Sequence, residues 1–307
     1  MVVDPPLLLA PMAGLTHSAL RRLLLEQGGV GLLSTEMLAA RRLPHDNPKI
    51  SPYLIRHPSE RPLSYQLLLV REEDVAGAVA AVERLEAQAL DLNLGCPAPE
   101  IRRLGGGSTL AANPELVGKL LRAVRRRTSL PLSAKIRLGE TLDAPRLRDF
   151  CLMLEDCGID MLTVHARLRG EPFCRKPRWP WVGKVKSWLK IPVVANGGIF
   201  SREDARCCLE QTGADALMIG RGAVVHPWIF QEITTGESSP ELDKTAIYLR
   251  YLELINESFA PERRLGRLKE FTHYYARNYT FGHHLASAVQ SSPDLESAQE
   301  RAREFLR

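Results

Sequence analysis

Eight short apolar segments alternate with segments of helical periodicity along most of the chain, and this alternation limits the fold more than any other feature. The apolar segments span residues 7–14, 32–37, 63–69, 89–97, 132–139, 161–167, 192–198 and 216–222. The segments between them with helical spacing span residues 16–27, 72–86, 114–127, 144–157, 181–189, 202–211 and 224–232. Because strands that alternate with helices pair in parallel, the pattern predicts an α/β fold.

Eight strand–helix units predict a (β/α)8 TIM barrel over about residues 5–235, which places a first domain at residues 1–235. An open, doubly wound sheet uses the same alternation. That alternative usually carries G-x-G-x-x-G directly after a strand, and no predicted strand is followed by this pattern. The barrel is therefore favoured. The segment 41–62 holds five prolines and is expected to be irregular, with one short helix.

A polar stretch at residues 234–243, "TTGESSPELD", ends the alternating region. From there to residue 307 the chain shows no strand pattern, only helical spacing such as that of Ile247, Tyr251 and Leu254. The sequence therefore predicts a small, all-helical C-terminal domain at residues 243–307.

The charge and the cysteine content indicate what kinds of partner and cellular environment the protein has. The formal net charge is +5, which hints at a polyanionic partner. The six cysteines form no C-x-x-C pair and no zinc-type spacing with histidine, so we expect no metal site and reduced thiols in the cytoplasm. No apolar run reaches the length of about 18 residues that a membrane span needs, and the N-terminus lacks the basic region of a signal peptide.

Polar or glycine-rich residues end almost every predicted strand, and in such barrels these ends build the active site. Strand-end side chains include Gln66, Asn93, Cys96, Lys135, Arg137, His165 and Arg167. Strands seven and eight end in Gly197-Gly198 and in Gly220-Arg221-Gly222, directly before predicted helices. Glycine lets backbone N–H groups approach a phosphate, although tight turns alone also explain these residues.

The bound group is expected to be larger than phosphate. Gln66 and Asn196 carry amides that both donate and accept, and Lys135 adds a cation. Together with the backbone of residues 11–13 they suit the polar edge of a flavin ring, with the phosphate of FMN on the last two strand loops. Taken separately, a buried Gln or Lys is more often a solvated or paired group, so the arrangement carries the inference.

Several motifs resemble the flavin-dependent tRNA-dihydrouridine synthases. They are "APMAG", "DLNLGCP", "GGGSTL", "KIRLG", "VHARLRGEPF", "IPVVANGGI" and "DALMIGRGAVVHPWIF", and they cover the whole chain in order. The resemblance implies an FMN-binding barrel, a helical tRNA-binding domain and NADPH-dependent reduction of particular uridines in tRNA. It implies FMN contacts at Pro11, Met12, Ala13, Gln66, Lys135, His165, Asn196, Gly197, Gly198, Gly220 and Arg221.

The same resemblance implies that Cys96 is catalytic and that Asn93, Arg137 and Arg167 bind the substrate. Three residues depart from the family pattern. Leu69 stands where glycine is expected, so the turn after strand three is expected to differ. Leu168 and Phe173 replace a threonine and an aromatic that is commonly tyrosine, which removes one hydroxyl from the expected substrate contacts.

The chemistry assigns Cys96 a role as general acid. Hydride from reduced FMN adds to C6 of uracil, and C5 then needs a proton, which a thiol on the opposite face supplies. Such an acid must stay protonated at neutral pH, so strong stabilisation of its thiolate is not expected. Lys135 and Arg137 are expected to stabilise the developing enolate oxygen or to orient the base.

Basic segments are expected to meet the RNA. Arg102 and Arg103 follow strand four, and residues 167–178 carry five cations against one acid. In the tail, residues 262–277 carry five cations and two acids among aromatics. The tail is most similar to the subgroup that acts near position 16 of the D-loop. We expect a monomer that has tRNA and NADPH as partners and no membrane.

Two other functions remain open from the sequence. An FMN-dependent dehydrogenase of small pyrimidines, of the dihydroorotate dehydrogenase type, uses a similar fold, but the basic rim and the helical tail argue against it. A non-catalytic nucleic-acid-binding regulator is the other alternative, and the presence of Cys96 beside a full set of flavin residues argues against that.

Overall fold

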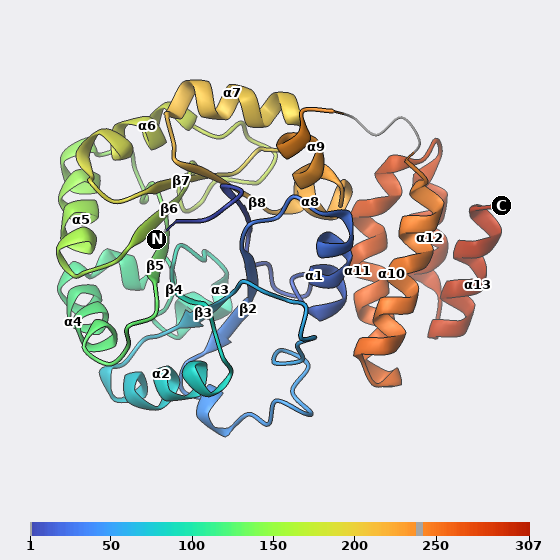
Figure 1. Ribbon diagram of the computed structural model, residues 1–307, viewed down its shortest axis with the longest axis horizontal. Coiled ribbons are helices and arrows are strands. Elements are labelled where there is room, and N and C mark those ends of the chain that lie inside the picture. Colours follow the sequence, from blue (N-terminus) through green and yellow to red (C-terminus); the bar gives the residue numbers. More distant parts are fainter. Residues whose placement is uncertain (1, 238–241) are drawn as a thin grey trace.

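The computed structural model describes residues 2–237 and 242–307. All eight strands lie in one parallel sheet with the order β1-β8-β7-β6-β5-β4-β3-β2. Hydrogen bonds between Leu9 N and Leu32 O and between Leu32 N and Leu7 O link β1 to the start of β2 and close the barrel (Figure 1). The strands are β1 Leu7–Leu9, β2 Leu33–Ala39, β3 Leu63–Leu68, β4 Ala89–Leu94, β5 Leu132–Arg137, β6 Met161–His165, β7 Val193–Asn196 and β8 Ala216–Ile219. The predicted TIM barrel is confirmed, and the open sheet is excluded.

Helices surround the sheet on its outer side (Figure 1). They are α1 Ser18–Gln27, α2 Val75–Arg84, α3 Pro99–Arg103, α4 Pro114–Arg125, α5 Ala144–Asp156, α6 Trp179–Trp188, α7 Arg202–Thr212, α8 Arg221–Val225 and α9 Ile229–Thr235. The prediction of one helix over residues 224–232 is wrong, because α8 ends before His226-Pro227 and α9 begins after it. Proline has no N–H to donate and disfavours helical geometry in the residue before it. The short helix α3 was not predicted.

Most strands end earlier than their apolar segments suggest. β1 stops at Leu9, and Gly14 adopts a φ of 75°, so the stretch after β1 is a loop. Likewise β4 stops at Leu94, two residues before Cys96. The predicted site residues at these positions therefore lie on loops beyond the ends of the strands, not within the strands.

The proline-rich segment 41–62 contains only a short 3₁₀ helix, Leu43–His45, and is held to the barrel by a buried ion pair. The carboxylate of Glu60, which is fully buried, accepts hydrogen bonds from Arg21 Nε at 2.5 Å and from the backbone N–H of His57 at 2.7 Å. The hydroxyl of Ser18 donates to the same carboxylate. These contacts fasten the end of the segment to α1.

Four further helices follow the barrel, as the helical spacing predicts: α10 Lys244–Ser258, α11 Arg264–Tyr275, α12 Gly282–Ser291 and α13 Leu295–Phe305. Part of the polar stretch 234–243, namely residues 238–241, lies outside the described residues. α10 packs against α1, where Arg250 pairs with Glu26 at 2.8 Å and Arg22 pairs with Glu257 at 2.6 Å (Figure 1). Buried hydrophobic side chains of the tail and the barrel form one continuous cluster.

Short connecting turns complete these elements: the 3₁₀ helices Glu72–Asp74, Leu110–Ala112, Pro261–Arg263 and Ala276–Asn278. Leu69, which replaces an expected glycine, is buried in the core at the end of β3. Within the described residues, no helix has both the length and the apolar character needed to cross a bilayer.

Candidate active site

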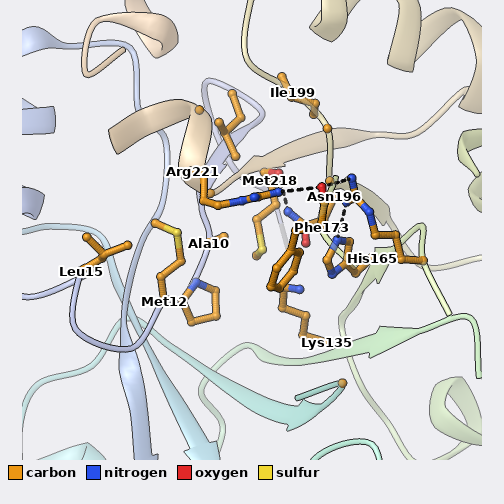
Figure 2. Close-up of a pocket in the computed structure, with 18 of the residues that line it drawn as sticks. Ala10, Met12, Leu15, Lys135, His165, Phe173, Asn196, Ile199, Met218 and Arg221 are labelled. Carbon is orange, nitrogen blue, oxygen red and sulfur yellow. Dashed lines mark hydrogen bonds between the residues drawn. The ribbon is translucent and has the colours of Figure 1, made fainter. Parts of the chain in front are cut away.

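A cavity of about 320 Å³ opens at the carboxyl ends of the strands. Figure 2 shows Lys135, His165 and Asn196, from three different strands, and Arg221, from the start of α8, converging on it. The structure brings the predicted site residues together here, with the exception of Gln66. The predicted residues that line the cavity are Pro11, Met12, Ala13, Asn93, Cys96, Lys135, Arg137, His165, Arg167, Asn196, Gly197, Gly198, Gly220 and Arg221.

Cys96 is a free, half-buried thiol on the loop after β4. Asn93 positions this loop, since its side-chain oxygen accepts hydrogen bonds from the backbone N–H of Cys96 at 2.9 Å and of Gly95 at 3.2 Å. Gly107 packs directly on the loop from the other side. A Cβ at Gly107 would lie 2.6 Å from the carbonyl oxygen of Cys96, so only glycine fits at the third position of the glycine run. The glycines after Cys96 thus fix the position of the thiol.

Gln66 lies beneath the cavity and is 1% exposed. Its amide donates to Asp91 Oδ2 at 2.7 Å and accepts from Asn93 Nδ2 at 2.8 Å, while Ser133 donates to the other oxygen of Asp91 at 2.6 Å. Burial raises the pKa of Asp91 despite these two donors. The structure therefore gives Gln66 and Asn93 a supporting role for the Cys96 loop, and the side chain of Gln66 does not reach the cavity lining.

Four basic groups face the cavity from β5 and β6. Burial lowers the pKa of Lys135 to about 8, and nearby Arg137 contributes to this shift. Burial, followed by Lys135 and Arg137, holds the pKa of His165 well below its usual value, so the imidazole is neutral. Arg167 Nη1 lies 3.0 Å from His165 Nε2 and can only donate, which leaves the imidazole proton on Nδ1. The wall thus combines cations with a neutral imidazole.

Glycines that follow β7 and β8 form the adjoining wall, where the chain passes close to neighbouring side chains. Gly197 has a φ of 109°, and a Cβ there would lie 2.7 Å from His165 Cδ2. The carbonyl of Gly197 accepts from Trp179 Nε1 at 2.9 Å, and the side chain of Asn196 donates to Met218 O at 2.7 Å. Gly222 packs on the backbone of the preceding loop, where a Cβ at Gly222 would lie 2.1 Å from Ile199 O. These contacts hold the two predicted phosphate loops together.

Phe173 occupies the middle of the cavity mouth, on the loop after β6 (Figure 2). Its ring stacks on His165 with 6.1 Å between centroids, and the guanidinium carbon of Arg221 lies 4.6 Å from its centroid. Arg137 lies 5.4 Å from the same ring and donates to Leu168 O at 2.9 Å. Of the three residues that depart from the family pattern, Phe173 lines the cavity and gives it an aromatic face without a hydroxyl, while Leu168 contacts Arg137 through its carbonyl.

The helical tail also contributes to the cavity, which the sequence did not predict. Glu270 and Tyr274, both on α11, line it. The end of α11 is fixed against α8 by Asn278, whose side chain donates to Val225 O at 2.6 Å. The sequence marked residues 262–277 as basic and aromatic, but it held no signal that this helix reaches the strand ends.

The basic rim is partly neutralised within the loop after β6. Arg167 is 2% exposed and donates to the carbonyls of Phe173 and Arg175, at 3.2 and 2.6 Å. Glu171 pairs with Arg178, and Arg169 pairs with Glu140. The exposed cations at this rim are Arg102, Arg103, Arg175 and Lys176. The expected basic rim therefore exists, with fewer free charges than the sequence suggested.

Comparisons with known proteins identify the family to which this chain belongs. A family model described as Dihydrouridine synthase (Dus) matches residues 8–305, which includes the barrel and the tail. The chain belongs to the dihydrouridine synthase family. The resemblance read from the motifs is thereby confirmed, together with the assignment to an oxidoreductase family.

Curated relatives of this family member match along most of their length. The Probable tRNA-dihydrouridine synthase 1 of Synechocystis sp. is 34% identical over 278 residues, 88% of this chain and 78% of the relative. The tRNA-dihydrouridine synthase B of Xanthomonas axonopodis pv. citri is 32% identical over 314 residues, 97% of this chain and 92% of the relative. The names of these relatives do not say which uridine of the tRNA is modified.

Solved structures share the barrel with this family member. Histamine dehydrogenase from Rhizobium sp. 4-9 superposes with a TM-score of 0.59 at 12% identity, over 77% of this chain and 46% of that one. Morphinone reductase superposes with a TM-score of 0.53 at 13% identity, over 80% of this chain and 90% of that one. At these identities the likeness is one of fold alone.

Proposed function

We propose that this chain reduces the C5=C6 bond of a uridine in tRNA, with FMN bound in the cavity and Cys96 donating the proton. One observation carries the proposal. In a member of the dihydrouridine synthase family, a free thiol and a set of cations line the same cavity. This is the combination that a reductive addition to a conjugated carbonyl needs, namely a proton for one carbon and positive charge for the oxygen.

The cavity fits a flavin by the chemistry of its donors. Lys135 makes no hydrogen bond within the described residues, although it is largely buried, so its ammonium needs an anionic or electron-rich partner. The neutral imidazole of His165 and the amide of Asn196 supply further hydrogen-bonding groups. Gly197 and Gly198 leave no room for side chains of their own, which lets a ring or a phosphate approach the backbone.

Different residues of the cavity would bind the ring and the phosphate of FMN. The backbone of Pro11, Met12 and Ala13, with Lys135 and His165, would hold the ring. Gly197, Gly198, Gly220 and Arg221 would hold the phosphate, for which Arg221 supplies the charge. Gln66 lies beneath the cavity and would act indirectly, by accepting a hydrogen bond from Asn93.

The proton step belongs to Cys96. A bound reduced flavin supplies the hydride that adds to C6 of uracil. The thiol of Cys96 gives its proton to C5, its S–H bond breaks as the C5–H bond forms, and solvent later reprotonates the thiolate. Asn93 and Gly107 hold the thiol in place for this transfer.

The charge that develops on O4 of uracil is stabilised by the cationic wall. Lys135 and Arg137 both line the cavity, and burial lowers the pKa of each. Charges in such a setting interact more strongly with a developing oxyanion than they would in water. Arg167 acts mainly on the imidazole and on the loop after β6, and so orients the substrate indirectly.

The uridine must leave its stack in the RNA to reach this cavity. The exposed cations of the rim and the basic helix α11 would bind phosphates on either side of it. We assign the tail at residues 243–307 to tRNA binding on this ground. By family resemblance, NADPH supplies the electrons to a cytoplasmic monomer, and the uridine lies near position 16.

The test compares wild type with Cys96→Ala. The variant should bind FMN, seen as the yellow absorbance, and should still be reduced by NADPH, but it should lose dihydrouridine formation in tRNA by about a hundredfold or more, in line with loss of a general acid. Dihydrouridine is measured by mass spectrometry of digested tRNA. NADH in place of NADPH tests the donor.

Equal turnover by Cys96→Ala contradicts the acid role. Cys174→Ala is the matched control, since Cys174 is an exposed thiol on the loop after β6 that does not line the cavity. Free uridine and dihydroorotate are assayed alongside tRNA. Turnover of these small molecules without turnover of tRNA would favour a small-pyrimidine dehydrogenase instead.

A further inference from the structure

A second cavity of about 600 Å³ adjoins the first, between the barrel and α11. Its walls come from the loop after β1, from the end of β2, from the proline-rich segment 41–62 and from the tail. The lining residues are Ala13, Gly14, Glu36, Met37, Leu38, Ala39, Arg42, Asp46, Tyr53, Gly266, Arg267 and Glu270. We call this space the side cavity.

The side cavity is continuous with the candidate active site. Ala13 and Glu270 line both spaces, so the two meet at the wall between the loop after β1 and α11. A uridine in RNA carries a neighbouring nucleotide on each side through a single phosphodiester link. With the uracil in the active site, one neighbour must lie immediately outside its mouth, and the side cavity is the adjoining hollow.

The lining of the side cavity suits one nucleotide. Tyr53 is 45% exposed and offers a ring face to a base. The side chain of Arg42 is 74% exposed and forms a long ion pair with Asp46, at 3.7 Å, which a phosphate can replace as the partner of the guanidinium. The two residues come from the same proline-rich segment, which Glu60 anchors to α1.

Buried polar groups on the inner wall lack partners. Glu36 is 4% exposed, and one of its oxygens accepts from the backbone N–H of Gly14 at 2.6 Å. The other oxygen of Glu36 and Nε of Arg267 are buried without a hydrogen-bond partner in the part of the chain that the structure describes. Burial raises the pKa of Glu36 and lowers that of Arg267, while Glu36 and Tyr53 act on the pKa of Arg267 in the opposite sense. An acceptor and a donor thus stand together on one wall, which matches the edge of a base.

We propose that the side cavity holds the nucleotide next to the target uridine, with its base against Tyr53, its base edge toward Glu36 and Arg267, and its phosphate at Arg42. This inference rests on the proposed function and extends it. It makes the enzyme sensitive to what flanks the uridine, and it assigns that sensitivity to the junction of barrel and tail.

Gly266 offers a way to fill the side cavity without harming the fold. It lies on α11 in ordinary helical conformation, and a Cβ there would meet nothing within 4 Å. Gly266→Leu would therefore place a side chain into the cavity, and Gly266→Ala would add only a methyl group. Both changes favour the helix, since glycine is a weak helix former.

The experiment combines these variants with altered RNA. The target uridine is first mapped in tRNA, and two transcripts are then made that lack the base on its 5′ or its 3′ side. For wild type, one of these transcripts should lower kcat/KM by about tenfold, as expected for loss of one stacked base. Gly266→Leu should show a similar loss with the intact transcript and no further loss with that abasic transcript. Gly266→Ala should behave as wild type.

Two results would overturn the inference. One is a Gly266→Leu enzyme with wild-type kcat/KM on the intact transcript. The other is a Gly266→Leu enzyme whose kcat/KM falls further, by the same factor as that of wild type, on each of the two abasic transcripts. FMN absorbance and the rate of flavin reduction by NADPH should be unchanged in all variants, because Gly266 does not line the active site. If wild type itself formed no dihydrouridine in tRNA, both the proposed function and this inference would fail, and that result is seen before any variant is compared.

Discussion

Lys135 is expected to make the binding of FMN depend on pH, and the size of this effect follows from its surroundings. Burial and the neighbouring Arg137 lower its pKa to about 8. The protonated fraction of such a group is about 0.9 at pH 7 and about 0.1 at pH 9. If the ammonium is the form that binds the electron-rich edge of the flavin, the affinity for FMN should fall about tenfold between pH 7 and pH 9.

The measurement is a titration of flavin-free protein with FMN, followed by the fluorescence of the flavin at several pH values. Two variants distinguish the effect of the positive charge at residue 135 from the effect of its loss as the pH rises. Lys135→Arg keeps a charge that does not titrate in this range and should bind with little dependence on pH. Lys135→Met should bind more weakly at pH 7 and show a flat profile. An affinity of wild type that stays constant from pH 7 to 9, or an equal slope in Lys135→Met, would refute the reasoning.

Two further predictions concern the free energy of unfolding, measured by urea denaturation. Glu60→Gln removes the charge opposite the buried Arg21 and should cost about 3–5 kcal/mol, whereas Glu203→Gln, in an exposed pair with Arg206, should leave the free energy of unfolding nearly unchanged. A small loss for Glu60→Gln would show that Arg21 finds another partner. Gly222→Ala would place a Cβ 2.1 Å from Ile199 O, so the loops after β7 and β8 must shift, at a cost of about 1–3 kcal/mol. Its FMN content should fall as well, and a variant with wild-type stability and flavin content would contradict the close packing described for these loops.

The barrel was predictable because its signal is periodic and repeats eight times. The strands are largely buried, and short ones such as Ala216–Ile219 are continuous apolar runs buried at every position. The ends of strands were less predictable, because apolar residues such as Met12 continue past the last ladder hydrogen bond to line the cavity. The break at Pro227 was missed because the apolar spacing of α8 and α9 runs through it.

The cavity was predictable where the residues follow strand ends, since the fold itself gathers these ends at one rim. This holds for Cys96, Lys135 and His165, whereas the roles of these residues stay predictions until the variants are tested. Gln66 lies within β3, and its amide forms hydrogen bonds with Asp91 and Asn93, a long-range pairing that no local sequence pattern predicts. Glu270 and Tyr274 were missed for a related reason, because contacts between the tail and the barrel depend on how α11 docks.

The docking of α11 has a consequence for how this enzyme can be divided. A truncated barrel without the helical tail would lose the part of the cavity wall that Glu270 and Tyr274 form. Its active site would be more open to solvent, so we do not expect the barrel alone to be an active reductase. If the tail binds RNA as proposed, substitutions in α11 that change RNA recognition also change the wall of the cavity, so recognition and catalysis are expected to evolve together.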